Sequence, residues 1–133
     1  MISFYRRPYL ADFLKSVSSW FEIVIFTAGG QEYADAILDS LNDCKQYIDH
    51  RLYWDHVSIM PQVETDMSEG GPQAQQNHSK SPSQQYYKDL SKMGRDLSKV
   101  LIVDNIEDNF QAQKDNGIQI REWRGDDPQD RAL

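Results

Sequence analysis

An α/β fold, with a parallel sheet flanked by helices, is the fold class that the sequence predicts. Two apolar runs, FEIVIF at 21–26 and VLIV at 100–103, have the composition of short strands that are buried on both faces. Residues 9–20 and 31–41 instead carry apolar side chains at helical spacing. Because strands that alternate with helices are typical of parallel sheets, these patterns together indicate the fold class.

The first elements are predicted from their local patterns. Ile2–Tyr5 has the composition of a short strand, and Pro8 suits the first turn of a helix. The helix predicted over Tyr9–Trp20 has one apolar face, formed by Leu10, Phe13, Leu14 and Val17. After the strand at 21–26 comes the helix Gln31–Leu41, and Ile48–Tyr53 is expected to contain another short strand.

The remaining elements follow a long polar segment. Residues 61–85 are mostly Gln, Ser, Asn, Gly, Pro, Glu and Asp, so we expect a disordered loop there. After the strand at 100–103, Asn105–Gln113 is expected to be helical and Ile118–Ile120 to form the last strand. Residues 122–133 have the composition of a polar tail.

Composition limits the class of protein. A chain of 133 residues is one domain in length, so residues 1–133 are interpreted as a single domain. The net charge of −7 argues against a nucleic-acid partner, because such domains carry a basic surface. The single cysteine, Cys44, excludes an intramolecular disulfide, and no apolar run has the length of a membrane span. An intracellular protein in the nucleus or cytoplasm is therefore expected.

Polar residues follow both apolar strands at the point where each strand ends. Asp104 and Asn105 come directly after the run at 100–103, and Thr27 with Ala28 and Gly29 follows the run at 21–26. In open α/β folds, ligands bind outside the carboxyl ends of the strands, so these residues are candidates for one site. Alternatively, Asp-Asn forms an ordinary turn, since both residues are common turn formers.

Five segments along the chain carry recognisable motifs: RRPYLADFL, FEIVIFTAG, YADAILDSL, KDLSKMGRDLSKVLIVDN and NGIQIREW. In their order and spacing they resemble the C-terminal-domain phosphatase family, also called NLI-interacting-factor-like, of the haloacid dehalogenase superfamily. The resemblance implies a haloacid-dehalogenase-like sheet. It also implies Mg²⁺-dependent hydrolysis of phosphoserine and phosphothreonine through an aspartyl-phosphate intermediate. A response-regulator receiver domain is the alternative fold, but its acidic strand would lie near the start of the chain.

The resemblance assigns expected roles to particular residues. Thr27 would grip a phosphoryl oxygen together with the backbone of Ala28 and Gly29, and Lys88 would neutralise the phosphoryl group. Asp104 and Asn105 would hold Mg²⁺ or orient Lys88. The predicted catalytic residues are therefore Thr27, Lys88 and Asp104, with Thr27, Ala28, Gly29 and Lys88 binding substrate. The expected partner is a phosphoprotein substrate or another protein.

Two departures from the family pattern change the expectation. The family's nucleophile lies in an Asp-x-Asp-x-Thr motif on the first core strand, upstream of the RRP helix, and residues 1–133 contain no such motif. We therefore expect a sheet that is incomplete at the first core strand and a chain that is inactive as given. Trp54 stands where the family usually has a phosphate-binding arginine. The alternative is a non-catalytic binding or tethering module with the same fold.

Overall fold

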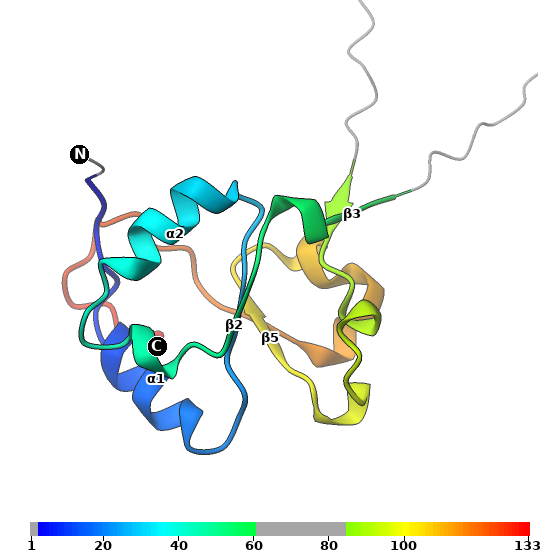
Figure 1. Cartoon of the computed structure of the whole chain (residues 1–133), viewed down its shortest axis with the longest axis horizontal. Coiled ribbons are helices and arrows are strands. Elements are labelled where there is room, and N and C mark those ends of the chain that lie inside the picture. Colours follow the sequence, from blue (N-terminus) through cyan, green and yellow to red (C-terminus); the bar gives the residue numbers. More distant parts are fainter. Residues whose placement is uncertain (1–2, 61–84) are drawn as a thin grey trace, which may run out of the picture.

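The computed structural model describes residues 3–60 and 85–133, and it arranges their strands as three two-stranded sheets (Figure 1). The parallel pairs are β1 (Val24–Phe26) with β2 (His50–Leu52), and β5 (Ile102–Asp104) with β6 (Gly117–Gln119). The third pair, which is antiparallel, is formed by β3 and β4, which span Ser58–Ile59 and Tyr86–Tyr87. The disordered loop expected at 61–85 falls almost entirely outside the described residues.

Two α-helices and five 3₁₀ segments accompany the strands. The α-helices are α1 (Leu10–Ser18) and α2 (Gln31–Asp39). The 3₁₀ segments are η1 (Lys45–Tyr47), η2 (Trp54–His56), η3 (Leu90–Met93), η4 (Leu97–Lys99) and η5 (Glu107–Asn116), all within the part of the chain that the structure describes. In Figure 1, α1 and α2 lie with β2 on one side of the molecule, and β5 lies on the other side with η3 to η5.

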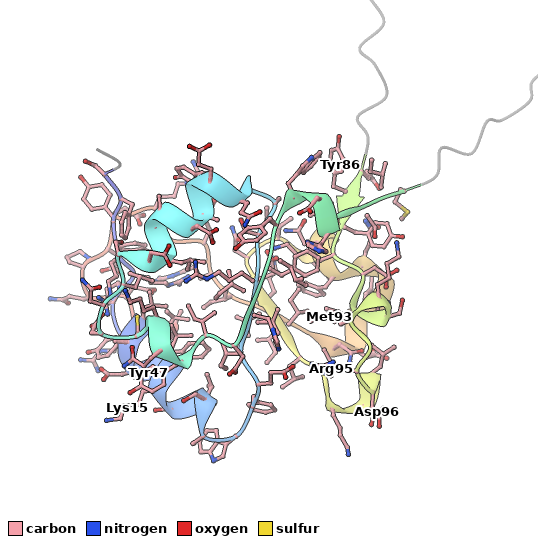
Figure 2. The ribbon with its side chains drawn as sticks, viewed as in Figure 1. Lys15, Tyr47, Tyr86, Met93, Arg95 and Asp96 are labelled. Atoms are coloured by element: carbon pink, nitrogen blue, oxygen red, sulfur yellow. The ribbon has the colours of Figure 1, made fainter. Side chains whose placement is uncertain are left out.

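Each side of the molecule has its own small core. Leu14 of α1 packs with Leu41 and Cys44, and Tyr47 of η1, which lies near α1 in Figure 2, packs against this cluster. On the other side, Leu90, Ile102 and Phe110 form a second cluster, joined by partly buried neighbours that include Met93 (Figure 2). The apolar face predicted for residues 9–20 is therefore confirmed at Leu14, which is 4% exposed.

Ion pairs fix α2 on β2. Arg51 of β2 donates to Asp35 Oδ1 at 2.8 Å and to Asp39 Oδ1 at 2.9 Å. The Tyr53 hydroxyl also donates to Asp35 Oδ1, at 2.5 Å, and together with Arg51 this bond lowers the pKa of the Asp35 carboxyl below its usual range. Two of these bonds therefore hold β2 against α2, and the third holds Tyr53, the residue that follows β2.

Several elements differ from the expectation at their ends. The start of the chain forms no strand over residues 3–7, and α1 begins at Leu10 because Tyr9 adopts the left-handed conformation, with φ 67°. β1 spans only three residues of the apolar run 21–26. The segment expected to be helical at 105–113 is the 3₁₀ segment η5, which begins at Glu107, ends at Asn116, and departs from helical geometry at Phe110 and Gln113.

Two further expectations are wrong. The strand at 100–103 was expected to be buried on both faces, but Leu101 is 55% exposed and Val103 is 43% exposed. Only one face of β5 packs on a core, through Ile102. The segment 122–133 is not a solvated tail, since Asp130 is 1% exposed and forms ion pairs with Arg7 and Arg121.

Candidate functional site

A buried ion pair lies at the carboxyl end of β5. Asp104 is the last residue of this strand, and its Oδ2 accepts a hydrogen bond from Lys88 Nζ at 2.7 Å. Lys88 and Asp104 are only 8% and 7% exposed. Lys88 directly follows β4, and its backbone N–H donates to the Asn109 carbonyl at 2.7 Å. Backbone hydrogen bonds therefore hold both partners in place.

The Asp104 carboxylate has further partners that fix its orientation. Its Oδ1 accepts the backbone N–H of Ile106 at 2.9 Å, and the Asn109 side-chain amide donates to both oxygens at 3.2 Å. One oxygen therefore forms the Asx turn that the sequence allowed, and the other faces Lys88, which is also one of the predicted site residues.

A cavity of about 360 Å³ opens beside this ion pair, and we call it the Lys88 cavity. Its lining residues come from the start of the chain, from the position that follows β4, from β5 and the segment after it, and from the segment after β6. They are Arg7, Lys88, Val103, Asp104, Asn105, Asn109, Ile120, Glu122 and Trp123. Three of the predicted site residues, Lys88, Asp104 and Asn105, thus line one cavity.

Thr27 lies outside the lining of this cavity but close to it in the chain fold. Its backbone N–H donates to the Leu52 carbonyl at 2.9 Å, and its Oγ1 accepts the Gly29 N–H at 3.0 Å. The preceding residue, Phe26, places its ring centroid 5.7 Å from Lys88 Nζ. The carboxyl end of β1 therefore lies near that of β5, as expected for strands that serve one site. Ala28 is exposed in the same turn.

Trp54 lies against the turn that contains Thr27. Its backbone N–H donates to the Gly29 carbonyl at 3.0 Å, and its ring lies 4.8 Å from that of Tyr86, centroid to centroid. The side chain is 47% exposed and is absent from the lining of the Lys88 cavity. The position at which the family usually carries an arginine thus holds an aromatic contact with β4.

Sequence reasoning missed Arg7, Asn109 and Trp123 as residues of the cavity. Arg7 belongs to the RRP segment, but nothing local in the sequence links it to residues near 104. Its Nε donates to Asp130 Oδ2 at 2.6 Å, across 123 positions of sequence, and such a long-range pair has no local signal.

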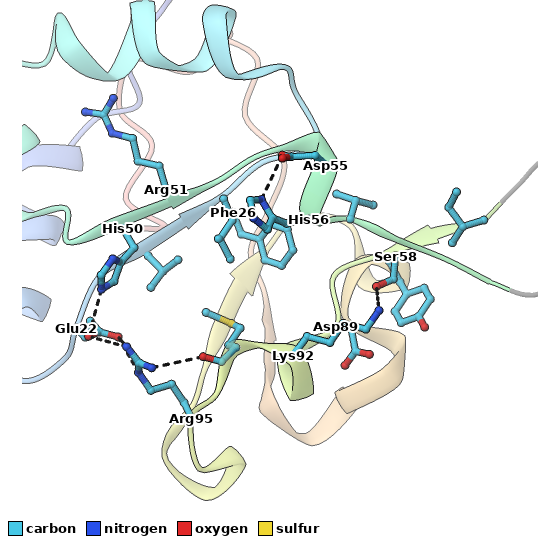
Figure 3. A pocket seen from close by; sticks show the side chains of 16 residues that line it. Glu22, Phe26, His50, Arg51, Asp55, His56, Ser58, Asp89, Lys92 and Arg95 are labelled. Carbon is cyan, nitrogen blue, oxygen red and sulfur yellow. Dashed lines mark hydrogen bonds and ion pairs between the residues drawn. The ribbon is translucent and has the colours of Figure 1, made fainter.

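A second, larger cavity of about 790 Å³ lies between β1, β2 and η3 (Figure 3). Arg95 donates to both oxygens of Glu22 there, at 3.0 and 3.2 Å, and Lys92 Nζ donates to Ser58 Oγ at 3.1 Å. Figure 3 shows these two interactions at different places on the wall. None of the predicted site residues lines this cavity.

The donor types available for a metal are those that Mg²⁺ prefers. Asp104 and Asn105 supply a carboxylate and a carboxamide oxygen to the Lys88 cavity. Within residues 3–60 and 85–133, no group of three or more His, Cys, Asp and Glu side chains forms a candidate metal cluster. Mg²⁺ is commonly held by one or two carboxylates with several waters, so two protein ligands fit this ion in kind.

Comparison with known families decides the identity. A family model described as NLI interacting factor-like phosphatase matches residues 1–133. The chain belongs to this family. The resemblance carried by the five motifs is therefore confirmed, and the α/β fold with short parallel sheets is compatible with the haloacid-dehalogenase-like fold of NLI interacting factor-like phosphatases.

Individual relatives in the family support the same assignment. The chain is 33% identical over 129 residues to CTD nuclear envelope phosphatase 1B of Danio rerio, covering 97% of this chain and 43% of that protein. It is 36% identical over 117 residues to CTD small phosphatase-like protein 3 of Caenorhabditis elegans, covering 88% and 33% of the two chains. This chain therefore spans less than half the length of these relatives.

Another relative in this family has a name that points to a different role. The chain is 31% identical over 120 residues to mitochondrial import inner membrane translocase subunit TIM50 of Kluyveromyces lactis, covering 90% of this chain and 20% of that protein.

Among the described residues, no helix has the length and apolar character needed to span a bilayer.

Proposed function

We propose that this chain is a phosphatase-type domain that acts on phosphoserine and phosphothreonine in proteins, with its phosphate pocket at the Lys88 cavity. The observation that carries the proposal is the buried Lys88–Asp104 pair at the end of β5, next to the end of β1. Family membership supplies the reaction class, since relatives are named as CTD phosphatases. The proposed substrate-binding residues are Lys88, in the lining of this cavity, and Thr27, Ala28 and Gly29, in the turn that follows β1.

Lys88 has the properties of a phosphate-neutralising cation. An ammonium group has three N–H donors, and only one is directed at Asp104, so the others remain for phosphoryl oxygens. Its burial strengthens each charge interaction relative to water. Phosphoryl transfer depends mainly on positioning and on stabilisation of the charge that builds on the phosphoryl oxygens. The Asp104 partner holds Lys88 ready for this task.

Asp104 and Asn105 are the proposed ligands of Mg²⁺. When bound, this ion would supply positive charge to the phosphoryl oxygens. Asp104 accepts hydrogen bonds from Lys88, Ile106 N–H and the Asn109 amide, so Mg²⁺ would take the place of one of these bonds, the longest being those from Asn109 at 3.2 Å. The Thr27 hydroxyl, which accepts from Gly29, keeps its own hydrogen free to donate to a phosphoryl oxygen.

We further propose that residues 1–133 alone do not hydrolyse phosphate esters, because they lack an Asp-x-Asp-x-Thr motif and the first core strand that carries it.

The direction of the backbone N–H and C=O groups in β1 supports a further strand beside it. The Thr27 N–H donates to the Leu52 carbonyl, and the His50 N–H donates to the Ile23 carbonyl. The odd-numbered positions along β1 therefore direct their backbone N–H and C=O groups toward β2. The N–H and C=O groups of Val24 and Phe26 therefore face the opposite edge, where the described residues offer no strand partner.

Within the described part of the chain, β5 also has one edge without a strand partner. Ile120 N–H donates to the Asp104 carbonyl, so Ile102 and Asp104 bond toward β6 and Val103 faces the other edge. Unpaired strand edges favour pairing with a further strand. Exposure of Val103 at 43% is consistent with a face that another element would cover.

A non-catalytic binding or tethering module is the second candidate function. It is supported by similarity to TIM50, which is named as a translocase subunit and not as a phosphatase. It is also supported by Trp54, because an indole cannot replace the bidentate guanidinium that binds phosphate. In this case the unpaired edges of β1 and β5 would serve a protein partner.

Hydrolysis of p-nitrophenyl phosphate with Mg²⁺ separates these candidates. The 133-residue chain should show no turnover. A second protein, in which an aliphatic strand ending in Asp-x-Asp-x-Thr is joined in front of residue 1, should turn over. The same protein with Lys88→Met should be at least ~10²-fold slower, since it lacks the cation that stabilises the transferring group. Turnover by the unmodified chain would disprove the proposed inactivity, and a silent extended protein would favour the binding module.

For the whole protein, we propose a phosphoprotein substrate and a place in the nucleus or cytoplasm. The similarity to a protein named nuclear envelope phosphatase supports the nuclear option. Fractionation of cells that express the tagged full-length protein tests this proposal, and recovery with mitochondria would overturn it.

A further inference from the structure

We infer that Arg7 is a second anion-binding cation of the Lys88 cavity, and that Asp130 is the positioning residue that holds Arg7 there. This inference rests on the proposed function, in which the cavity takes a phosphoryl group. It adds a guanidinium at a site whose expected arginine position is occupied by Trp54. It also assigns a role to the segment 122–133, which would hold Arg7 in place through Asp130.

Arg7 is held on one side of its guanidinium and available on the other. Its Nε donates to Asp130 Oδ2 at 2.6 Å, and its Nη2 donates to the Arg121 carbonyl at 2.8 Å. Among the described residues, Nη1 has no hydrogen-bond partner. The Arg7 side chain is 15% exposed and lines the cavity, so a fixed guanidinium with an uncommitted end borders the same space as Lys88.

The Lys88 cavity has more unused donors than unused acceptors. Lys88 has N–H groups beyond the one given to Asp104, and Arg7 has Nη1. The Asn105 amide, whose oxygen is the proposed Mg²⁺ ligand, has an NH₂ group without a partner among the described residues. The Asp104 oxygens are already engaged by Lys88, Ile106 and Asn109. The remaining carboxylate, that of Glu122, pairs with Arg124. A ligand with several acceptor oxygens, namely an oxyanion such as phosphate, satisfies this set.

Asp130 positions Arg7 and would not itself contact the bound anion. It is 1% exposed, it does not line the cavity, and it accepts from Arg121 Nη2 at 2.5 Å as well as from Arg7. Hydrogen bonds from these two guanidiniums lower the pKa of the Asp130 carboxyl to about 2, so it stays ionised under ordinary conditions. A carboxylate that is fixed from two sides locks the rotamer of Arg7.

Titration of the ¹⁵N-labelled chain with inorganic phosphate, with Mg²⁺ present, tests this directly. We expect the side-chain signals of both Arg7 and Lys88 to shift, whereas Arg6, which pairs with Asp43 away from the cavity, should not respond. If Lys88 responds and Arg7 does not, this inference is overturned while the proposed function stands. If neither responds, both fail. Because the unmodified chain is used, the result does not depend on a variant that folds.

Variants then separate anion binding from a merely structural role. Arg7→Met should weaken phosphate binding roughly tenfold or more, the amount expected for one charge-assisted hydrogen bond, and Arg6→Met should not change it. Asp130→Asn should weaken binding several-fold, and Asp130→Glu should restore part of it. Phosphate affinity that is unchanged in folded Arg7→Met, judged by circular dichroism, would refute the assignment.

Discussion

The ammonium of Lys88 lies 5.7 Å from the centroid of the Phe26 ring, so the ends of two separate parallel sheets meet at one side chain. A cation at this distance from an aromatic face is attracted to it, by about 0.5–1 kcal/mol at exposed sites and more when desolvated. Lys88 also pairs with Asp104 at the end of β5. One residue thus connects β1 to β5, which share no backbone pairing.

Replacing Lys88 with methionine should destabilise the fold strongly. The substitution leaves the Asp104 carboxylate, 7% exposed, without its cation, and breaking one side of a buried pair costs about 3–5 kcal/mol. Urea unfolding followed by circular dichroism measures the loss. Lys99→Met, at an exposed position, is the matched control. The double variant Lys88→Met with Asp104→Leu should recover part of the loss, and a cost below about 1 kcal/mol for the single variant would contradict the prediction.

Gly117→Ala should destabilise the chain through a steric clash. A Cβ at Gly117 would lie 2.0 Å from Cδ2 of Phe110, a ring that is 4% exposed in the second core cluster. Overpacking of this kind costs about 1–3 kcal/mol. Gly30→Ala is the control, since a Cβ there meets nothing within 4 Å. Both glycines have negative φ, so the backbone itself tolerates alanine at either position. Equal melting temperatures for the two variants would exclude the clash.

Asp130 should make stability depend on pH in acid. Its folded-state pKa of about 2 lies below the ordinary value of 3.8, so its contribution to the free energy of unfolding is fully present above 3.8. The contribution is lost as pH falls toward 2, when the carboxyl takes up its proton. The difference in stability between the unmodified chain and Asp130→Asn should therefore shrink over this window. A stability difference that stays constant over this window would contradict the prediction.

Cys44 should react slowly with thiol reagents. It is the only cysteine, it is 0% exposed, and burial raises the pKa of its thiol. Since the thiolate is the reactive form, labelling by Ellman's reagent at pH 8 should follow opening of the cluster with Leu14 and Leu41. In guanidinium chloride the same thiol should label at the rate of a free cysteine. Fast labelling of the folded chain would show that this core is open.

The sequence anticipated what depends on local pattern. Apolar periodicity located α1 and α2, and the polar residues after two apolar runs pointed to Asp104 and Thr27 as residues near one site. It could not anticipate the division into three small sheets, because strand pairing depends on which edges meet in space. The exposure of Val103 follows from that division.

The role of the last residues was also hidden. An Asp in a polar segment is ordinarily solvated, and its burial is tolerable here because two guanidiniums pair with it. Arg121 lies 9 positions away in sequence, but Arg7 lies 123 positions away. The same pairing brings Arg7 to the Lys88 cavity. Contacts between positions so distant in sequence leave no trace in periodicity or composition.

The Arg7–Asp130 pair has a mechanical consequence. Because these residues are 123 positions apart, a load applied in opposite directions to residues 3 and 133 would reach this contact before it reached α1 or β5. The pair bridges the two ends of the segment 8–129, so it bears the load in place of that segment until it breaks. Stretching a single molecule in optical tweezers should therefore produce its first rupture at a force that falls when Asp130 is replaced by Asn.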